Sequence, residues 1–204
     1  MRAVLAALAL LLAAPGPAWP ESPTEEMQQY TERVLQLIQD TVLREKDTIE
    51  ALQAAVRKVA IQVFGAPEAA EGALGRHWEE LTPAERDDFV LLFAEFLEAI
   101  YISRMDKEGG VRVRYVGELV EGDRADVRAR VFTKRGHELT VDARLVRRDG
   151  RWLIFDIAVE QISLVANYRA QFDRVIRKSG YAELARLIRV KRDGLLKSKR
   201  AAAD

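Results

Sequence analysis

The sequence contains no cysteine, and this absence removes several kinds of chemistry at once. Its 204 residues include no cysteine and only two histidines. Disulfide bonds, thiolate nucleophiles and thiolate metal sites are therefore excluded. His77 and His137 stand far apart and in no spacing typical of metal ligands, so we interpret them as surface or turn residues. We expect no metal and no cofactor.

A net charge is missing as well. The 32 basic and 32 acidic residues give a formal net charge of zero, so no global field recruits nucleic acid, and we predict no nucleic-acid partner. The basic segment 191–200 is typical of a solvated C-terminus, and equally of a segment that contacts anionic lipid headgroups or an acidic partner. Nucleotide-binding glycine loops and the nucleophile motif G-x-S-x-G are also absent, which argues against the common enzyme classes.

Long hydrophobic runs are absent except at the N-terminus. An apolar run from Ala3 to Ala14 follows a single arginine and precedes a helix-breaking Pro-Gly-Pro and the small residue Ala18. This layout is typical of a secretory signal peptide, and the run is shorter than the roughly 20 residues that span a bilayer. We predict a signal peptide over residues 1–18, cleaved near Ala18 rather than retained as an anchor. A cysteine-free exported chain fits a bacterial periplasm.

The first part of the mature chain has helical periodicity. Apolar residues recur at steps of three and four between residues 25 and 64, which predicts two successive amphipathic helices. Asp47 and Glu50 have the spacing of a capping box for the second helix, and the Gly-Ala-Pro sequence at 65–67 is expected to end it. A small-residue, loop-like stretch is predicted to follow.

The segment 81–105 carries the clearest helix start in the sequence. Thr82 is a favourable N-cap, Pro83 suits the first helical position, and Glu85 completes a capping box. Large apolar residues cover more than one narrow stripe of this helix. We therefore expect it to be central and contacted on several sides.

Four strand-like runs follow, separated by short turns suited to hairpins. They are residues 111–119, 124–132, 137–146 and 151–160. Helical spacing then returns over 163–180 and, in a short final helix, over 181–190, and residues 193–204 are predicted to be a flexible basic tail. The predicted fold class is α+β: a four-strand antiparallel meander covered on one face by helices, in a single domain over residues 24–192.

One face of this sheet is built from small apolar residues. On the second and third strands they alternate with charged residues, which we interpret as a solvated outer face. The small residues are Ala125, Val127, Ala129, Val141 and Ala143. The space above them is filled either by aromatic residues of the facing helices or by a bound apolar ligand. The pattern alone favours the closed core.

Asp156 places a carboxylate in an otherwise apolar strand. Burial there raises the pKa of a carboxyl group, and steroid-isomerase-like folds use an acid in a similar sheet-lined pocket. No tyrosine or second acid with a recognisable spacing accompanies Asp156. We therefore prefer a structural acid that bonds to the backbone or to an arginine, and keep a small-molecule enzyme as the alternative.

The joint after the fourth strand contains Trp152, Asp156 and the segment 159–172, VEQISLVANYRAQF. These residues resemble the pattern W-x-(I/V)-x-D-(I/V) followed by E-G-(I/V)-S-L-(I/V)-x-N-(Y/F)-R-x-x-F. That pattern is the signature of the MlaC family, the toluene-tolerance or phospholipid-binding ABC-transport auxiliary proteins. Gln161 departs from the pattern, which has glycine there. The spacing of Phe89, Phe93, Leu97 and Tyr101 also fits, so the resemblance covers about residues 24–192.

The resemblance implies a fold like nuclear transport factor 2 with an added helical layer and an apolar pocket for lipid acyl chains. It also implies a periplasmic, monomeric carrier without catalysis. Such a carrier shuttles phospholipid between an outer-membrane lipoprotein complex and an inner-membrane ABC transporter complex, and so helps to maintain outer-membrane lipid asymmetry. The alternative is an interaction module with a fully packed interior that binds envelope proteins.

Alternation and the resemblance together predict which residues line the pocket. They are Phe89, Phe93, Phe96, Val127, Ala129, Val131, Val141, Ala143, Tyr168 and Phe172. In the joint, Ser163 is expected to cap the following helix. Asn167 and Arg169 either tie that helix to the sheet edge or serve as plain scaffold.

Overall fold

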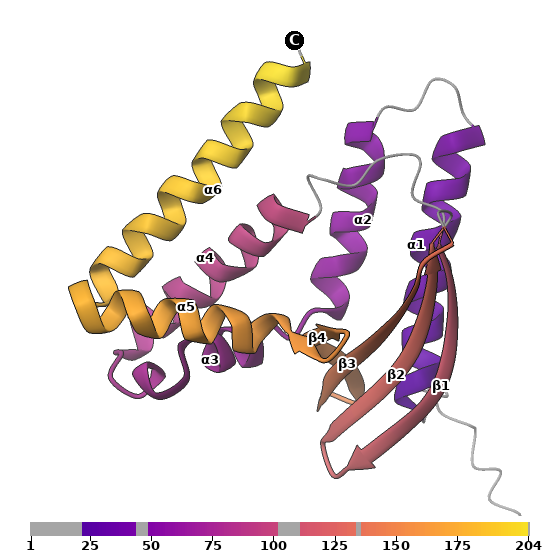
Figure 1. Cartoon of the computed structure of the whole chain (residues 1–204), viewed down its shortest axis with the longest axis horizontal. Helices are drawn as coiled ribbons and strands as arrows, with labels where there is room; N and C mark the ends of the chain where they lie inside the picture. Colours follow the sequence, from indigo (N-terminus) through magenta and orange to yellow (C-terminus); the bar gives the residue numbers. More distant parts are fainter. Residues whose placement is uncertain (1–21, 44–48, 102–110, 134–135, 204) are drawn as a thin grey trace, which may run out of the picture.

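A computed structural model describes residues 22–203 apart from 44–48, 102–110 and 134–135. Helices come first, a sheet follows, and two helices close the chain (Figure 1). The elements are α1 (Pro23–Leu43), α2 (Ile49–Val63), α3 (Ala66–Leu74), the 3-10 helix η1 (Gly75–Trp78), α4 (Pro83–Tyr101), β1 (Val111–Glu121), β2 (Arg124–Thr133), β3 (Glu138–Arg148), β4 (Arg151–Val159), β5 (Ile162–Ser163), α5 (Leu164–Ser179) and α6 (Tyr181–Ala203). The predicted α+β class is confirmed. The predicted signal peptide lies outside the described residues.

The sheet is an open antiparallel meander in the order β1-β2-β3-β4-β5. The four predicted strands are all present, and the two-residue β5 adds a short fifth strand beside the end of β4. The turn between β3 and β4 has left-handed backbone at Asp149 (φ 50°) and Gly150 (φ 78°), the geometry of a tight hairpin. Irregular pairing bends β1 near Gly117 and the β3–β4 pair near Leu145.

Two predictions about the helices are corrected. The loop-like stretch after α2 is helix α3, because Pro67 stands near the start of a new helix rather than only after the end of the old one, and four alanines favour it. The final helix does not end near residue 190 but continues to Ala203, since its Lys, Arg, Leu and Ala residues are good helix formers and one glycine does not stop it. The flexibility of residues 193–204 stays a prediction.

The capping box at the start of α4 is confirmed. The Glu85 carboxylate accepts hydrogen bonds from the backbone N–H of Thr82 at 2.9 Å and from its hydroxyl at 2.7 Å. These bonds lower the pKa of Glu85, with the Thr82 hydroxyl as the main cause. The helix is central, as predicted: its six buried residues are Phe89, Leu92, Phe93, Phe96, Leu97 and Ala99. The predicted capping residue Asp47 of α2 lies outside the described residues.

The buried residues form two separate hydrophobic clusters rather than one. The helical cluster joins α3, α4, α5 and α6. The sheet cluster consists of Ala125, Val127, Ala143, Leu145 and Trp152, with Met27, Tyr115 and Ile154 packed against it. In Figure 1 the helical layer lies to one side and the sheet with α1 to the other, with α2 between them. The two layers therefore have separate cores, which meet where α3 and α5 contact β4.

Candidate functional site

The inner face of the sheet is set by the pairing register. Val127 lies opposite Ala143, Ala129 opposite Val141, and Val131 opposite Leu139. Directly paired residues point to the same side of a sheet, so these apolar residues share the inner face. The opposite, outer face carries charged pairs such as Arg128 with Asp142 at 2.6 Å. The predicted division into an apolar and a charged face is confirmed.

One end of the inner face is closed by α1. The sheet cluster packs there, and the Tyr115 hydroxyl donates to the backbone carbonyl of Met27 at 3.0 Å. The Glu118 carboxylate accepts a hydrogen bond from the backbone N–H of Thr24 at 2.9 Å, which fixes the start of α1 against β1. Trp152, 2% exposed, is among the most deeply buried side chains of this end.

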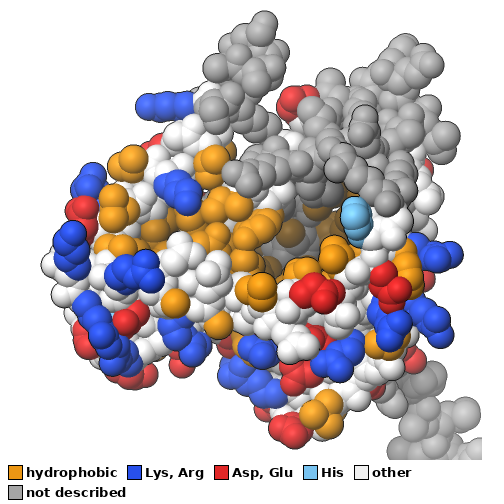
Figure 2. Space-filling view, in the orientation of Figure 1, with side chains coloured by type: hydrophobic (Ala, Val, Ile, Leu, Met, Phe, Trp, Pro, Cys, Tyr) orange, Lys and Arg blue, Asp and Glu red, His pale blue; other side chains and the backbone are white. Residues whose placement is uncertain are grey.

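The other end of the inner face is open. There Val111 is 38% exposed, Ile157 39% and Val159 42%. Val141, the cross-strand partner of Val159, and Val131 on β2 are only half-buried. Figure 2 shows a hollow near the middle of the molecule, in the region where Figure 1 places α2 and α4 beside the sheet, and much of its visible wall is hydrophobic. Apolar area left uncovered on a sheet face is an expected feature of a binding groove.

The aromatic residues predicted for the pocket pack chiefly on one another. Phe89 and Phe93 stack with their ring centroids 5.8 Å apart, and Phe172 meets Phe93 edge to face at 5.8 Å. Tyr168 contacts both Phe93 and Phe96 at about the same separation. Such contacts add to the stabilisation that burial provides. These five rings, which we call the aromatic floor, therefore fill the space between α4 and α5 in the helical layer.

The structure divides the ten predicted lining residues into two groups. The five aromatics belong to the helical cluster, whereas Val127 and Ala143 belong to the sheet cluster. Ala129 is buried, and Val131 and Val141 stand at the open end of the inner face. The lipid-lining role of all ten stays a prediction.

Sequence reasoning missed other residues of the open end. Ile157 and Val159 continue the apolar alternation on β4, and Val111 and Val113 do so on β1. The period-two signal was present in the sequence. Only the pairing of β1 with β2 and of β4 with β3 places these residues on the inner face.

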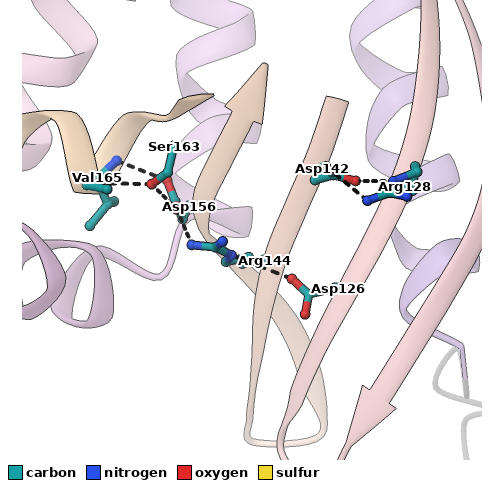
Figure 3. Close-up of polar contacts among 8 residues, drawn as sticks. Asp126, Arg128, Asp142, Arg144, Asp156, Ser163 and Val165 are labelled. Atoms are coloured by element: carbon teal, nitrogen blue, oxygen red, sulfur yellow. Dashed lines mark hydrogen bonds and ion pairs between the residues drawn. The ribbon is translucent and has the colours of Figure 1, made fainter. Parts of the chain in front are cut away.

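Asp156 joins β4 to the start of α5 (Figure 3). Its carboxylate accepts hydrogen bonds from the Ser163 hydroxyl at 2.6 Å, the Val165 backbone N–H at 3.0 Å and Arg144 Nη1 at 3.0 Å. Asp156 lies opposite Arg144, on the charged outer face and away from the open end. The preferred interpretation of Asp156 as a structural acid is confirmed, and the enzyme alternative loses the residue on which it depended.

The Ser163 hydroxyl also caps α5. It accepts a hydrogen bond from the backbone N–H of Ala166 at 2.9 Å, so this prediction is confirmed. One side chain thus links a helix terminus to a buried carboxylate. The bonds at Ser163 and Val165 fix the direction in which α5 leaves the sheet, and with it the position of the aromatic floor.

The turn before this cap is left-handed at two residues. Glu160 has φ 48° and Gln161 φ 67°. Glycine adopts this conformation at least cost, which explains why the MlaC-like pattern has glycine at the position of Gln161. The turn is held by Thr140, whose backbone N–H donates to the Glu160 carboxylate and whose carbonyl accepts from the Glu160 N–H.

Of the two roles left open for Arg169, the structure supports plain scaffold rather than a tie to the sheet edge. Arg169 Nε donates to the backbone carbonyl of Gly72 at 2.6 Å, so it ties α5 to α3. The reason is that α3, which the sequence did not predict, lies beside α5. Asn167 is exposed on the surface of α5.

A buried polar cluster connects α1 to β4. The carboxylate of Glu26, 3% exposed, accepts hydrogen bonds from the Tyr30 hydroxyl and from the Trp152 backbone N–H. Arg151 Nη2 donates to the Tyr30 hydroxyl at 3.2 Å and to the Gln62 carbonyl at 3.0 Å. Burial, followed by the bond to Glu26, raises the pKa of Tyr30. The cluster is a structural brace at the closed end.

Comparison with known proteins identifies the family. The sequence model of the MlaC protein family matches residues 28–189, which is most of the chain and includes the joint around Asp156. The chain belongs to the MlaC family. The predicted resemblance is therefore confirmed. No curated protein has significant sequence similarity to the chain.

A solved structure has the same fold. It is the phospholipid-binding protein from Ralstonia solanacearum, determined in complex with a phospholipid. The two chains superpose with a TM-score of 0.72 over 84% of this chain and 97% of the other, at 19% sequence identity. This MlaC-family chain therefore shares its architecture with that protein. Among the described residues of the present chain, no helix is long and apolar enough to cross a membrane. In the same residues, no group of three or more His, Cys, Asp or Glu side chains could hold a metal ion.

Proposed function

We propose that this protein is a non-catalytic, monomeric periplasmic carrier of phospholipid. Its cargo would pass between an outer-membrane lipoprotein complex and an inner-membrane ABC transporter complex, a traffic that helps to maintain outer-membrane lipid asymmetry. Membership of the MlaC family supports a role in binding and transport. So does the shared fold with a protein solved in complex with a phospholipid.

The observation that carries the proposal is the uncovered apolar surface at the open end of the sheet. Val141 stands at its centre, between Ala129 of β2 and Val159 of β4. Acyl chains lying on this surface would contact the sheet on one side and the helices on the other. Burial of hydrocarbon stabilises by about 0.8 kcal/mol per methylene, so two chains supply ample free energy to hold a lipid in water.

The half-open inner face also supports the carrier over the alternative of a module with a fully packed interior. Such a module has no reason to leave Val111, Ile157 and Val159 exposed on the inner face. The charged outer face of the sheet, by contrast, is well formed by cross-strand pairs such as Arg128 with Asp142. The uncovered apolar area is therefore specific to one side of the sheet.

Lipid extraction tests the proposal directly. The purified protein is expected to release phospholipid into organic solvent, detected by mass spectrometry, and to take up labelled phospholipid from vesicles. Val141→Trp is expected to abolish uptake, because the indole occupies the open end. Arg130→Trp, on the outer face of the neighbouring strand, is the matched control and should take up lipid normally. A wild-type protein that is empty and takes up no lipid would contradict the proposal.

A further inference from the structure

Charge is divided unevenly between the helices, although the chain as a whole is neutral. The residues 164–197, in α5 and α6, include nine Lys or Arg and three Asp or Glu. The described residues between Ser22 and Tyr101 include five basic and fourteen acidic residues. The excess of positive charge is therefore carried by α5 and α6, which we call the positive pole. Figure 2 shows Lys and Arg side chains along this edge of the molecule.

A shallow depression lies on the outer surface of α5, within the positive pole. Its volume is about 510 Å³, and it is lined by Ala170, Asp173, Arg174, Arg177 and Lys178. The three basic residues are exposed. Arg177 pairs with Asp173 at 3.1 Å, whereas neither Arg174 nor Lys178 has an ion pair with any residue that the structure describes.

The acid in the depression is already neutralised by its neighbours. Asp173 accepts hydrogen bonds from Arg76 Nη2 at 2.6 Å and interacts with His77 Nε2 at 2.9 Å. These partners, Arg76 first, lower the pKa of Asp173 to about 2, so its carboxylate is ionised and internally paired at neutral pH. The charges of Arg174 and Lys178 consequently remain available to an external anion.

We propose that the outer face of α5, formed by Arg174, Arg177 and Lys178, binds the anionic headgroups of a phospholipid bilayer. Arginine forks bind phosphate oxygens in a bidentate manner, and the depression presents two such groups and a lysine together. A protein partner generally requires an aromatic or large apolar anchor at the centre of its interface. The lining of the depression has no such residue, whereas a charged bilayer surface needs none.

This face is independent of lipid carriage. On α5, Tyr168 and Phe172 point into the helical cluster, while Ala170 and Arg174 lie on the exposed side. Docking through α5 holds the carrier at the bilayer by electrostatics and leaves the open end of the sheet free.

Vesicle flotation tests the proposal. The wild-type protein at low salt is expected to float with vesicles of phosphatidylcholine containing phosphatidylglycerol, and not with vesicles of phosphatidylcholine alone. Each Lys or Arg near an anionic surface strengthens binding about fivefold, so the triple variant R174A/R177A/K178A should bind about a hundredfold more weakly. Raising the salt should release the wild-type protein, because exposed charges are screened.

The control variant K58A/R112A/R114A removes three exposed basic residues from α2 and β1 and changes the net charge equally. It is expected to keep near-normal binding and normal lipid uptake. Equal losses in the two triple variants, or no flotation of the wild-type protein at low salt, would overturn the proposal. Binding to immobilised polyglutamate but not to anionic vesicles would assign the face to an acidic polypeptide instead, and would overturn it too. Lipid uptake of R174A/R177A/K178A into the free protein should be unchanged, which separates this proposal from the carrier function.

Discussion

At the scale of single residues, Asp156 determines how the helical layer is attached to the sheet. It is 4% exposed and its carboxylate accepts hydrogen bonds from a hydroxyl, a backbone N–H and a guanidinium. A buried charge is tolerated only when it is fully hydrogen-bonded. The geometry of this joint is thus a requirement of folding rather than evidence of catalysis, and a sequence cannot separate the two by the identity of the acid alone.

Replacing Asp156 by asparagine should therefore destabilise the fold. The amide keeps the shape but loses the charge and turns an N–H group toward one of the three donors, so the free energy of unfolding should fall by about 2–4 kcal/mol. Urea denaturation measures this change. Asp142→Asn, which breaks the exposed pair with Arg128, is the matched control and should cost no more than about 1 kcal/mol. Equal effects of the two substitutions would show that the joint is unimportant.

At the scale of elements, the packing of α3 on α5 depends on a glycine. A Cβ atom on Gly72 would lie 2.7 Å from Val165 Cγ1, closer than side chains approach one another. The neighbouring Gly75 has φ +57° and lies against the side chain of Arg169. The two glycines allow α3 and η1 to approach α5 closely enough for the Arg169 hydrogen bond to the Gly72 carbonyl.

A pair of glycine substitutions isolates this contact. Gly72→Ala and Gly194→Ala both replace a helical glycine, and each gains up to about 1 kcal/mol of helix propensity. No atom lies within 4 Å of a Cβ at Gly194, so that variant should be stabilised. Gly72→Ala should instead lose about 1–2 kcal/mol net through overpacking against Val165. Thermal unfolding compares them, and stabilisation by Gly72→Ala would contradict the close approach.

At the scale of the whole molecule, the two hydrophobic clusters are joined by few direct contacts. The Arg148–Glu68 ion pair at 2.6 Å links β3 to α3, and the Asp156 joint links β4 to α5. The end of the inner face that α1 does not cover leaves Val111, Ile157 and Val159 exposed. A bound lipid would cover these side chains, so the ligand itself would become part of the hydrophobic core.

Removal of lipid should accordingly lower the thermal stability of the protein. Ligand that binds only the folded state raises stability by RT ln(1 + [L]/Kd), about 2.7 kcal/mol at a hundredfold excess over Kd. For a chain of this size, that change corresponds to roughly 5–10 °C in Tm. Differential scanning calorimetry before and after extraction, and again after adding phospholipid back, measures it. An unchanged Tm in the wild-type protein, or an equal shift in Val141→Trp, would argue against a lipid-filled core.

The sequence by itself determined the local features of this protein. The capping residues Thr82 and Ser163, the four strands with their apolar and charged faces, and the family of the chain were all predictable, because each depends on residues close together in the chain or on a contiguous motif. Even α3 has a local signal, Pro67, although the same residue equally fits the end of the previous helix.

Tertiary structure decided what the alternating pattern left open. The pattern could not tell that the five aromatic rings pack on one another, that Arg169 reaches α3, or that Ile157 and Val159 remain uncovered. These facts depend on how α1 and the helical layer sit against the sheet, and that arrangement is fixed by contacts between residues distant in sequence, such as Glu26 with Trp152. Spacing along the chain specifies which face of a strand is apolar, but only the packing of the layers specifies how much of that face is covered.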